Sequence, residues 1–271
     1  MKQHRARKRF GQNFLHDQAI IAQIIAAIHP QANQHIVEIG PGKGALTKPL
    51  LQALHLIKNK GGETHPLDVV ELDRDLPVLL RETCAEYSDL RIHLADALKF
   101  DFCGLVNNNR KLRITGNLPY NISTPLIFHL LQQLHCIKDM HFMLQKEVVE
   151  RLSAAPGSSA YGRLSVMVQY RCRVENLFTV HPGSFIPAPK VDSAIVRLIP
   201  YSQPPIQVYD EKQLSRLVTQ AFSQRRKTLR NTLKTLLSAE QIASVNIDPG
   251  LRAETLTLEQ FAQLSNLLKD E

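Results

Sequence analysis

The alternation of apolar and polar residues along the chain predicts short buried strands separated by amphipathic helices. Five isoleucines between residues 20 and 28 recur at helical spacing, so residues 17–28 are predicted to form a helix that Asp17 caps. Beyond it, β-rich runs alternate with helical patterns, which is typical of an α/β domain with a mainly parallel sheet. The predicted strands are residues 36–40, 68–73, 91–96, 113–119, 141–145 and 193–200, the last at the end of the sheet, and the predicted helices are residues 45–54, 75–86 and 125–134.

The pattern changes after residue 200. Residues 201–208 include two consecutive prolines, which break the alternation, so we interpret this stretch as a linker. From Asp210 onward, apolar residues recur only at helical spacing, and a last helix is predicted at residues 258–268. The chain is therefore predicted to consist of an α/β domain over residues 1–203 and a small all-helical domain over residues 204–271.

Charge is distributed unevenly along the chain. The 33 Lys+Arg against 25 Asp+Glu give a formal net charge of +8, and a hydrophobic share of 44% excludes disordered and collagen-like proteins. Residues 1–9 contain five Lys/Arg and residues 212–239 contain seven, both without an acid, so the remainder has 21 basic and 25 acidic residues. Two basic segments on an acidic remainder predict nucleic acid or an anionic membrane surface as partner, although a solvated helix face with a charged tail also fits.

Three further features narrow the class of protein. No apolar stretch is long enough to span a membrane, and no apolar region of a signal peptide follows the basic start. The four cysteines, Cys84, Cys103, Cys136 and Cys172, are far apart and include no CxxC pair, so we expect buried reduced thiols in a cytoplasmic protein. The eleven histidines show no metal-ligand spacing, and we predict no structural or catalytic metal.

The strongest local motif is VEIGPGKGALT, at residues 37–47. A predicted strand ends at Gly40, and a glycine-rich turn leads into a helix, so a ligand can approach the backbone beside the positive end of the helix dipole. The spacing of Gly40, Gly42 and Ala45 indicates a nucleoside-containing cofactor, but it leaves NAD and S-adenosylmethionine open.

Acidic residues follow at the ends of the next two predicted strands. Glu71 ends the second strand, where a carboxylate can accept hydrogen bonds from both hydroxyls of a ribose. Asp96 ends the third strand, and it either binds the exocyclic amine of a cofactor adenine or caps a helix.

The segment GNLPYNIST (residues 116–124), at the end of the fourth strand, favours chemistry on a planar amine. The Asn117 side-chain oxygen and the Leu118 carbonyl can accept hydrogen bonds from an –NH₂ group, which turns the lone pair of its nitrogen towards an electrophile. Pro119 fixes the turn, and Tyr120 offers a face on which a base can stack. The alternative is that this segment is a structural loop with a packed tyrosine. This alternative is disfavoured in a chain that also contains a glycine-rich turn typical of nucleoside binding.

Together these motifs resemble those of the ribosomal RNA adenine dimethyltransferases. NLPY is joined by QNFL at residues 12–15 and FIPAPKVDS at residues 185–193. Further matches in the same order are ELDRDL, MHFMLQKEV, YGRLSV and FSQRRKTLRN, at residues 71–76, 140–148, 161–166 and 222–231. The resemblance covers essentially the whole chain, and it is closer to the bacterial small-subunit (16S) enzymes than to the drug-resistance relatives that act on large-subunit RNA. One departure is a long polar stretch at residues 55–68, which we predict to be a surface loop.

The resemblance implies a Rossmann-like methyltransferase sheet, S-adenosylmethionine as the methyl donor and a helical RNA-binding domain. It also implies the substrate, two adjacent adenines in a loop near the 3′ end of 16S rRNA, each dimethylated on its exocyclic amine late in small-subunit biogenesis. We expect a cytoplasmic monomer without a metal or a membrane partner, whose activity affects antibiotic sensitivity. The residues expected at the cofactor are Asn13, Leu15, Gly40, Gly42, Glu71, Asp96, Ala97 and Asn117.

An adenine in RNA must leave its stack to enter such a site, and its base then needs aromatic contacts. Phe185 is a candidate for the face opposite Tyr120, or else it is a core aromatic. The expected catalytic residues are Asn117, Leu118, Pro119, Tyr120 and Phe185. The residues expected to contact RNA phosphates are Arg5, Arg7, Lys8, Arg9, Arg225, Arg226, Lys227 and Arg230, the last four in one helical stretch.

Other functions stay open at this point. A large-subunit rRNA adenine methyltransferase would share the turn and the NLPY segment, but it is not expected to match across the C-terminal domain. A non-catalytic RNA-binding assembly factor would keep the fold without needing Asn117, Pro119 and Tyr120. An NAD-dependent dehydrogenase would explain the glycine-rich turn but neither the NLPY segment nor the basic segments.

Overall fold

The computed structural model describes residues 13–106 and 110–268, and these divide into two compact units. Unit 1 comprises the residues up to 149 together with 175–200, and unit 2 comprises 150–174 and the residues from 201 onward. The two units therefore alternate along the chain, because residues 150–174 belong to unit 2 although sheet strands follow them. The predicted basic N-terminal segment, with Arg5, Arg7, Lys8 and Arg9, lies outside the described residues.

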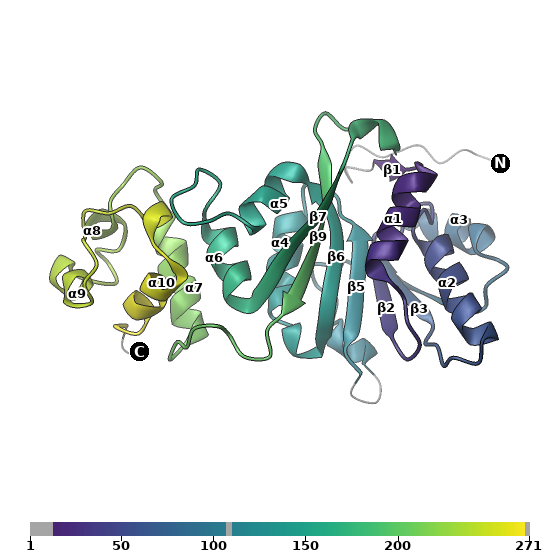
Figure 1. Cartoon of the computed structure of the whole chain (residues 1–271), viewed down its shortest axis with the longest axis horizontal. Coiled ribbons are helices and arrows are strands. Elements are labelled where there is room, and N and C mark those ends of the chain that lie inside the picture. Colours follow the sequence, from purple (N-terminus) through teal and green to yellow (C-terminus); the bar gives the residue numbers. More distant parts are fainter. Residues whose placement is uncertain (1–12, 107–109, 269–271) are drawn as a thin grey trace. The chain divides into compact units, whose positions relative to one another are not determined.

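Unit 1 is built on a seven-stranded sheet with the strand order β4-β3-β2-β5-β6-β9-β7 (Figure 1). From β4 to β6, neighbouring strands run parallel, and β9 pairs with β6 in the antiparallel direction. This confirms the predicted α/β class. The strands are β2 (His35–Ile39), β3 (Leu67–Glu71), β4 (Leu90–Leu94), β5 (Leu112–Asn117), β6 (Ile137–Gln145), β7 (Cys172–Val180) and β9 (Ser193–Pro200).

Helices cover both faces of this sheet. In Figure 1, α1 (Gln18–Ile28) and α2 (Thr47–Asn59) lie in front of the sheet, and α4 (Ser123–Leu131) lies behind it. The Asp17 carboxylate caps α1 as predicted, since it accepts hydrogen bonds from two backbone amides of the first turn. On the packed side of α1, the isoleucine stripe enters the main apolar core. Helix α3 (Leu76–Thr83) also belongs to this unit, and α5 (Lys146–Leu152) begins in unit 1 and ends in unit 2.

Three details of unit 1 differ from the expectation. Strand β7 occupies the edge of the sheet, so β9 lies one position inward rather than at the end. We did not predict β7, because its mixture of exposed and half-buried residues follows no clean alternation. Helix α2 continues to Asn59, since Leu54 is buried and Ile57 half-buried, so the predicted loop at residues 55–68 begins later than expected.

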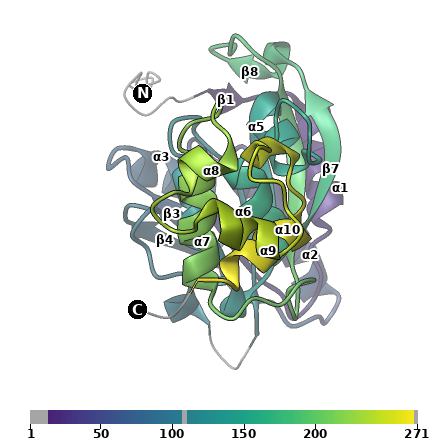
Figure 2. The same ribbon diagram turned by 90° about the vertical axis from the view of Figure 1, so that its left-hand side faces the viewer.

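Unit 2 is helical, and Figure 2 looks onto its helices. Helix α7 packs against α6 and α10, and its apolar stripe is buried, as expected from the helical spacing of apolar residues after Asp210; the stripe consists of Leu214, Leu217, Val218 and Ala221. Phe222 follows α7 and contacts the rings of Tyr161 and Phe261 in the core of the unit. The helices are α6 (Arg163–Arg171), α7 (Glu211–Ala221), α8 (Leu229–Thr232), α9 (Ala239–Ser244) and α10 (Leu258–Ser265).

The cysteines correct one expectation. Cys84 and Cys172 are buried free thiols, as expected, but Cys103 and Cys136 are joined by a disulfide. They are 33 residues apart in the sequence and lie in two short 3₁₀ helices, Cys103–Leu105 and Leu134–Cys136, which hydrophobic periodicity does not pair.

Among the described residues, none of the helices combines the length and the apolar character that crossing a membrane requires.

Candidate active site

A cavity of about 840 Å³ lies at the carboxyl ends of the parallel strands β2, β3, β4 and β5. Each strand contributes the residues that follow its last position, so the cavity forms where ligands bind in open α/β sheets. Its volume is in the range of cofactor and small-molecule sites.

The cavity brings together most of the residues expected at the cofactor and the reacting base. The lining residues that the sequence predicted are Asn13, Leu15, Gly40, Gly42, Glu71, Asp96, Ala97, Asn117, Leu118, Pro119 and Tyr120. Phe185 is not among them, since it is 3% exposed and packs in the main apolar core, the alternative that we considered. The next two residues, Ile186 and Pro187, line the cavity instead.

One wall of the cavity consists of two segments that are far apart in the sequence. Strand β1 (Phe14–Leu15) pairs with β8 (Phe185–Ile186) in a two-stranded antiparallel sheet. This pairing places QNFL beside FIPAPKVDS and explains why both motifs belong to one site. The Lys43 ammonium lies 4.5 Å from the centre of the Phe14 ring, which attaches this wall to the glycine-rich turn through a cation–π contact.

Glycine is required in the glycine-rich turn and also at the neighbouring end of strand β5. Gly40 and Gly42 have φ angles of 67° and 56°, which residues with a Cβ adopt only with strain. At the end of the neighbouring strand β5, a Cβ on Gly116 would lie 2.4 Å from the Ile39 carbonyl oxygen, so glycine allows the two strands to approach there.

Glu71 connects this turn to the end of β3. One carboxylate oxygen accepts a hydrogen bond from the Gly42 amide (3.3 Å), and the other accepts one from the Asp73 amide (2.9 Å). Burial raises the pKa of Glu71, although these amides favour the charged carboxylate. The arrangement holds an acceptor at the position predicted for a ribose.

The Asp96 side chain has one of the two roles that the sequence left open and lies where the other is expected. One of its oxygens accepts a hydrogen bond from the Leu98 amide at 3.0 Å, so it caps the turn after β4. The other oxygen accepts no hydrogen bond from a described residue, and Asp96 lines the cavity. It therefore keeps an acceptor for a polar hydrogen such as that of an exocyclic amine.

Asn117 is oriented by its own hydrogen bond. The side-chain nitrogen donates to the backbone oxygen of Asn13, at 3.1 Å. The side-chain oxygen receives no hydrogen bond from the described part of the chain, and neither does the Leu118 carbonyl oxygen in the turn that follows. Both residues line the cavity, so they offer two oxygen acceptors there, as many as an –NH₂ group has hydrogens.

The Tyr120 ring is held at the same wall. Its hydroxyl forms a hydrogen bond with the Ser193 hydroxyl, at 3.1 Å, and Ser193 begins β9. Helix α4 begins three residues after Tyr120, and Ser123 donates a hydrogen bond to the Tyr120 carbonyl oxygen. These contacts fix the loop between β5 and α4, so the ring is positioned before any base arrives.

One acidic residue of the cavity, Glu38, was not predicted from the sequence. Glu38 lies in β2, is 2% exposed and accepts a hydrogen bond from the Thr47 hydroxyl at 2.7 Å. Burial, with a smaller contribution from the charge of Glu71, raises the pKa of Glu38 to about 8. A carboxylate within an otherwise apolar strand could have indicated this residue, because an acidic side chain is rarely fully buried unless it has a polar partner.

Four of the basic residues expected at RNA phosphates, Arg225, Arg226, Lys227 and Arg230, are located in unit 2, but not in one helix as predicted. Helix α7 ends at Ala221, and residues 225–227 form an exposed turn before α8, which carries Arg230. Arg225 is already paired, because its guanidinium contacts the Glu254 carboxylate and the Ser159 carbonyl. Within the described ranges, Arg226, Lys227 and Arg230 have no acidic partner, so their charges are available.

Potential metal ligands gather away from the cavity. In the described part of the chain, Cys103, His135 and Cys136 are grouped closely enough to hold an ion. Their two sulfur atoms are bonded to each other, so they offer no thiolates in this state.

Comparison with known proteins identifies similar chains. A family model described as ribosomal RNA adenine dimethylase matches residues 3–270. The ribosomal RNA small subunit methyltransferase A of Pseudomonas aeruginosa is 59% identical over 268 residues, which is 99% of this chain and 96% of that protein.

Solved structures are similar as well. A dimethyladenosine transferase from Plasmodium falciparum has a TM-score of 0.73 and 27% identity, covering 93% of this chain and 95% of that one. The 23S rRNA methyltransferase ErmE shares the fold, with a TM-score of 0.70 and 22% identity, covering 94% of this chain and 99% of its own.

Proposed function

The chain belongs to the ribosomal RNA adenine dimethylase family, and from this premise we propose how its cavity binds S-adenosylmethionine and dimethylates two adjacent adenines near the 3′ end of small-subunit rRNA. The chain is an rRNA adenine dimethyltransferase, and the 59% identity favours the small-subunit substrate over a large-subunit one. The fold does not distinguish them, since ErmE shares it.

The observation that carries the proposal is the orientation of Asn117. Its nitrogen is occupied by the Asn13 carbonyl, so the oxygen is the part of the amide that can accept from a substrate. A protein that only binds RNA would not require the free oxygens of Asn117 and Leu118 at the wall of the cavity.

The lining residues fit the proposed methyl donor. The glycine-rich turn keeps side chains away from the backbone, Glu71 offers a carboxylate to the ribose, and Asp96 offers one to the adenine amine. We assign Asn13, Leu15, Gly40, Gly42, Ala97 and Asn117 to the same binding surface. The sulfonium methyl that S-adenosylmethionine supplies is already electrophilic, so the protein needs no metal to activate it.

The task of the chain is alignment. In our proposal the Asn117 oxygen and the Leu118 carbonyl accept the two amine hydrogens and direct the nitrogen lone pair towards the methyl group. Tyr120 stacks on the base, while Pro119 fixes the turn. After the methyl group has been transferred, the amine nitrogen releases its extra proton to water, so no general base is required beforehand.

In the same proposal, the adenine is flipped out of a loop of the RNA, and Arg226, Lys227 and Arg230 of unit 2 bind flanking phosphates. The residues of the basic N-terminal segment are assigned the same role. The enzyme acts as a monomer in the cytoplasm, on 16S rRNA within the small subunit or its precursor.

In the decisive experiment, the purified protein is incubated with S-adenosylmethionine that carries a labelled methyl group. The substrate offered is undermethylated small ribosomal subunits, large subunits or free RNA. We expect label in small-subunit rRNA only, on two adjacent adenines near the 3′ end that each become dimethylated. Mapping by mass spectrometry of nuclease fragments locates the modified bases. Label in large-subunit rRNA, or binding to small subunits without any transfer, would contradict the proposal.

A further inference from the structure

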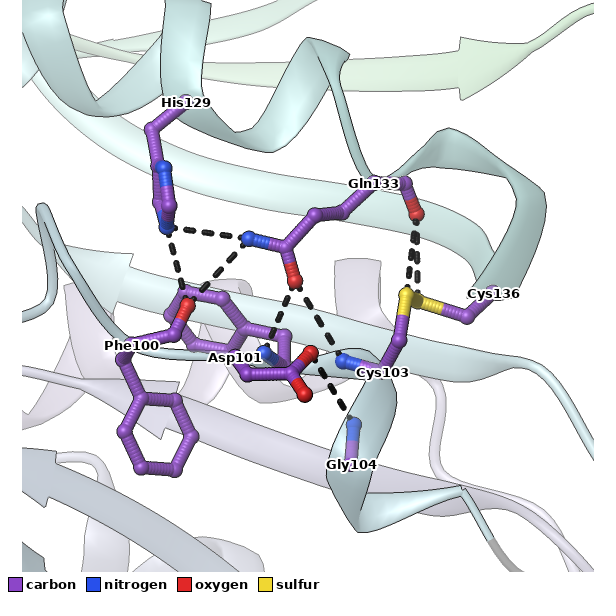
Figure 3. The surroundings of a disulfide bond; sticks show 8 residues. Phe100, Asp101, Cys103, Gly104, His129, Gln133 and Cys136 are labelled. Carbon is purple, nitrogen blue, oxygen red and sulfur yellow. Dashed lines mark hydrogen bonds between the residues drawn. A yellow bond between two sulfur atoms is a disulfide. The ribbon is translucent and has the colours of Figure 1, made fainter.

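The disulfide between Cys103 and Cys136 lies in unit 1 and outside the cavity, since neither cysteine lines it. The Cα atoms of the two residues are 5.5 Å apart. Figure 3 shows the pair beside Gln133, which follows helix α4. The question is what holds the two cysteines at this distance.

Gln133 holds the two segments together without the disulfide. Its side-chain oxygen accepts hydrogen bonds from the amides of Phe102 (2.8 Å) and Cys103 (3.3 Å), and its side-chain nitrogen donates to the Phe100 carbonyl at 3.2 Å (Figure 3). Three hydrogen bonds of one side chain therefore fix the backbone of Cys103 against the segment that carries Cys136. Opening the S–S bond leaves these contacts intact, so the two thiols stay within reach of each other.

The reduced thiols would also find a partner at once. The Gln133 backbone oxygen lies 3.1 Å from the Cys136 sulfur and 3.6 Å from the Cys103 sulfur, so it can accept a hydrogen bond from either thiol. Both redox states thus satisfy the local polar groups, which is the requirement for a pair that converts reversibly.

One cysteine of the disulfide, Cys103, is more accessible to solvent than the two free thiols. Cys84 and Cys172 are each 1% exposed, and burial raises the pKa of their thiols to about 11 and about 12. Cys103 is half-buried, and the exposed His135 has a ring nitrogen within 4.8 Å of both its sulfur and that of Cys136. Cys103 is therefore the cysteine of the pair that a small reagent can reach most readily.

We propose that Cys103 and Cys136 form a reversible dithiol–disulfide site that reacts with low-molecular-weight disulfides. The Cys103 thiolate attacks one sulfur of the small disulfide, forms a mixed disulfide and releases the other half as a thiolate, which takes up a proton. Cys136 then attacks the Cys103 sulfur as a thiolate, which breaks the mixed disulfide and releases the second small thiol. Two electrons pass from the cysteine pair to the small disulfide, and the two cysteine protons end on the two released thiols.

The test exposes the full-length protein to mixtures of reduced and oxidised glutathione. After acid quenching, free thiols are alkylated in denaturant and each cysteine is assigned by peptide mass spectrometry. We expect Cys103 and Cys136 to convert together between two alkylated thiols and one cross-linked peptide as the mixture becomes oxidising. Cys84 and Cys172 serve as internal controls and should stay reduced throughout. A disulfide that persists in excess reduced glutathione, or thiols that never oxidise, would overturn the proposal.

Single variants separate the attacking from the resolving cysteine. Cys136→Ser should stop at a stable mixed disulfide on Cys103, whereas Cys103→Ser should react at least about tenfold more slowly, because Cys136 is buried. Both variants should retain methyl transfer, which verifies that they fold. Equal reaction rates of the two variants would contradict the assigned order of attack.

Discussion

Asn117 illustrates how much a single hydrogen bond decides at the scale of a residue. An amide side chain has a donor end and an acceptor end, and the Asn13 carbonyl occupies the donor end. The acceptor end is thereby committed to a ligand that carries N–H groups. The same contact explains why a residue of the β1 segment influences a group more than a hundred residues later in the chain.

Replacing Asn117 by alanine should therefore separate binding from chemistry. We expect Asn117→Ala to lower kcat by about 100-fold or more, as when one preorganised hydrogen-bonding group is removed from an active site. The affinity for S-adenosylmethionine should change far less, because the other residues assigned to the cofactor surface remain. Calorimetric titration of the cofactor and single-turnover methyl transfer measure the two quantities. Asn59→Ala, at the exposed end of α2 and outside the cavity, is the control and should retain wild-type turnover. Near-normal turnover in Asn117→Ala would remove the orienting role.

Glu38 leads to a prediction about pH. Its pKa is raised from the ordinary 4.5 to about 8, so the folded protein holds a proton that the unfolded chain releases over this interval. The stability contributed by this protonation is complete below pH 4.5 and is lost as the pH rises towards 8. Glu38→Gln removes the ionisation and keeps an acceptor for Thr47.

We expect the free energy of unfolding of Glu38→Gln, relative to wild type, to rise with pH between about 5 and 8 and then to level off. Urea unfolding of the cofactor-free proteins in a pH series measures this difference. Glu63→Gln, at an exposed position, is the control and should show no such trend. A difference independent of pH would mean that Glu38 is ionised in the folded protein.

The sequence predicted the place of several residues where the residue type is itself the signal. Asn117, Glu71 and Asp96 lie at or just after the ends of strands that periodicity locates, and parallel strands bring such ends together at the cavity. Phe185 was ambiguous for a physical reason, because an aromatic ring beside a motif packs in a core as readily as against a ligand. Side-chain direction in a two-residue strand depends on its partner, which the sequence does not reveal.

At the scale of elements, the central strands and the amphipathic helices follow from local patterns, whereas the edges of the sheet do not. Strand β7 is half-exposed and has no clean alternation, so the sequence carried no strong signal for it. The basic stretch after α7 was predicted to be helical because apolar residues recur at helical spacing from Asp210 onward. It forms a turn instead, as the apolar stripe ends at Ala221 and Phe222 packs with Tyr161 and Phe261.

The disulfide is an element-scale feature, because it joins two short helical turns. Closing a chain segment of 33 residues restricts the unfolded state, and the expected stabilisation is about 4 kcal/mol in the chain-entropy description. Reduction should lower the free energy of unfolding by up to this amount without altering the folded structure, since Gln133 maintains the contact.

Urea unfolding with and without a reductant measures this difference. The double variant Cys103→Ser/Cys136→Ser is the control, and it should be insensitive to the reductant. An equal response to the reductant in both proteins would place the effect elsewhere.

At the scale of the whole molecule, the cavity lies within unit 1, whereas unit 2 carries the unpaired basic residues Arg226, Lys227 and Arg230 after α7. Unit 1 has 20 Lys+Arg and 16 Asp+Glu and unit 2 has 13 and 9, so the net charge of +8 divides equally between the units and does not locate a basic surface. Basic residues that are already paired, such as Arg225 with Glu254, contribute less to RNA binding than a count of charges suggests.

Reversing the charges of Arg226, Lys227 and Arg230 to glutamate should weaken RNA binding and leave cofactor affinity unchanged. If each residue contacts one phosphate, the slope of log Kobs against log salt should fall by about 2, since each contact to a single strand contributes about 0.7. Filter binding at several salt concentrations measures the slope. Lys60, Lys111 and Lys138, exposed residues of unit 1, provide a control with the same change of net charge. An equal loss in the control would indicate non-specific attraction only.

The pairing of β1 with β8 has a consequence for the order in which the site comes into existence. The wall of the cavity joins residues 13–15 to residues 185–187, so it is completed only when the chain has been synthesised beyond Pro187. Until then, a nascent chain has the glycine-rich turn and the NLPY segment but lacks one side of the cavity that would enclose a ligand. The enzyme that modifies ribosomal RNA thus acquires its binding site only after a ribosome has translated more than two thirds of it.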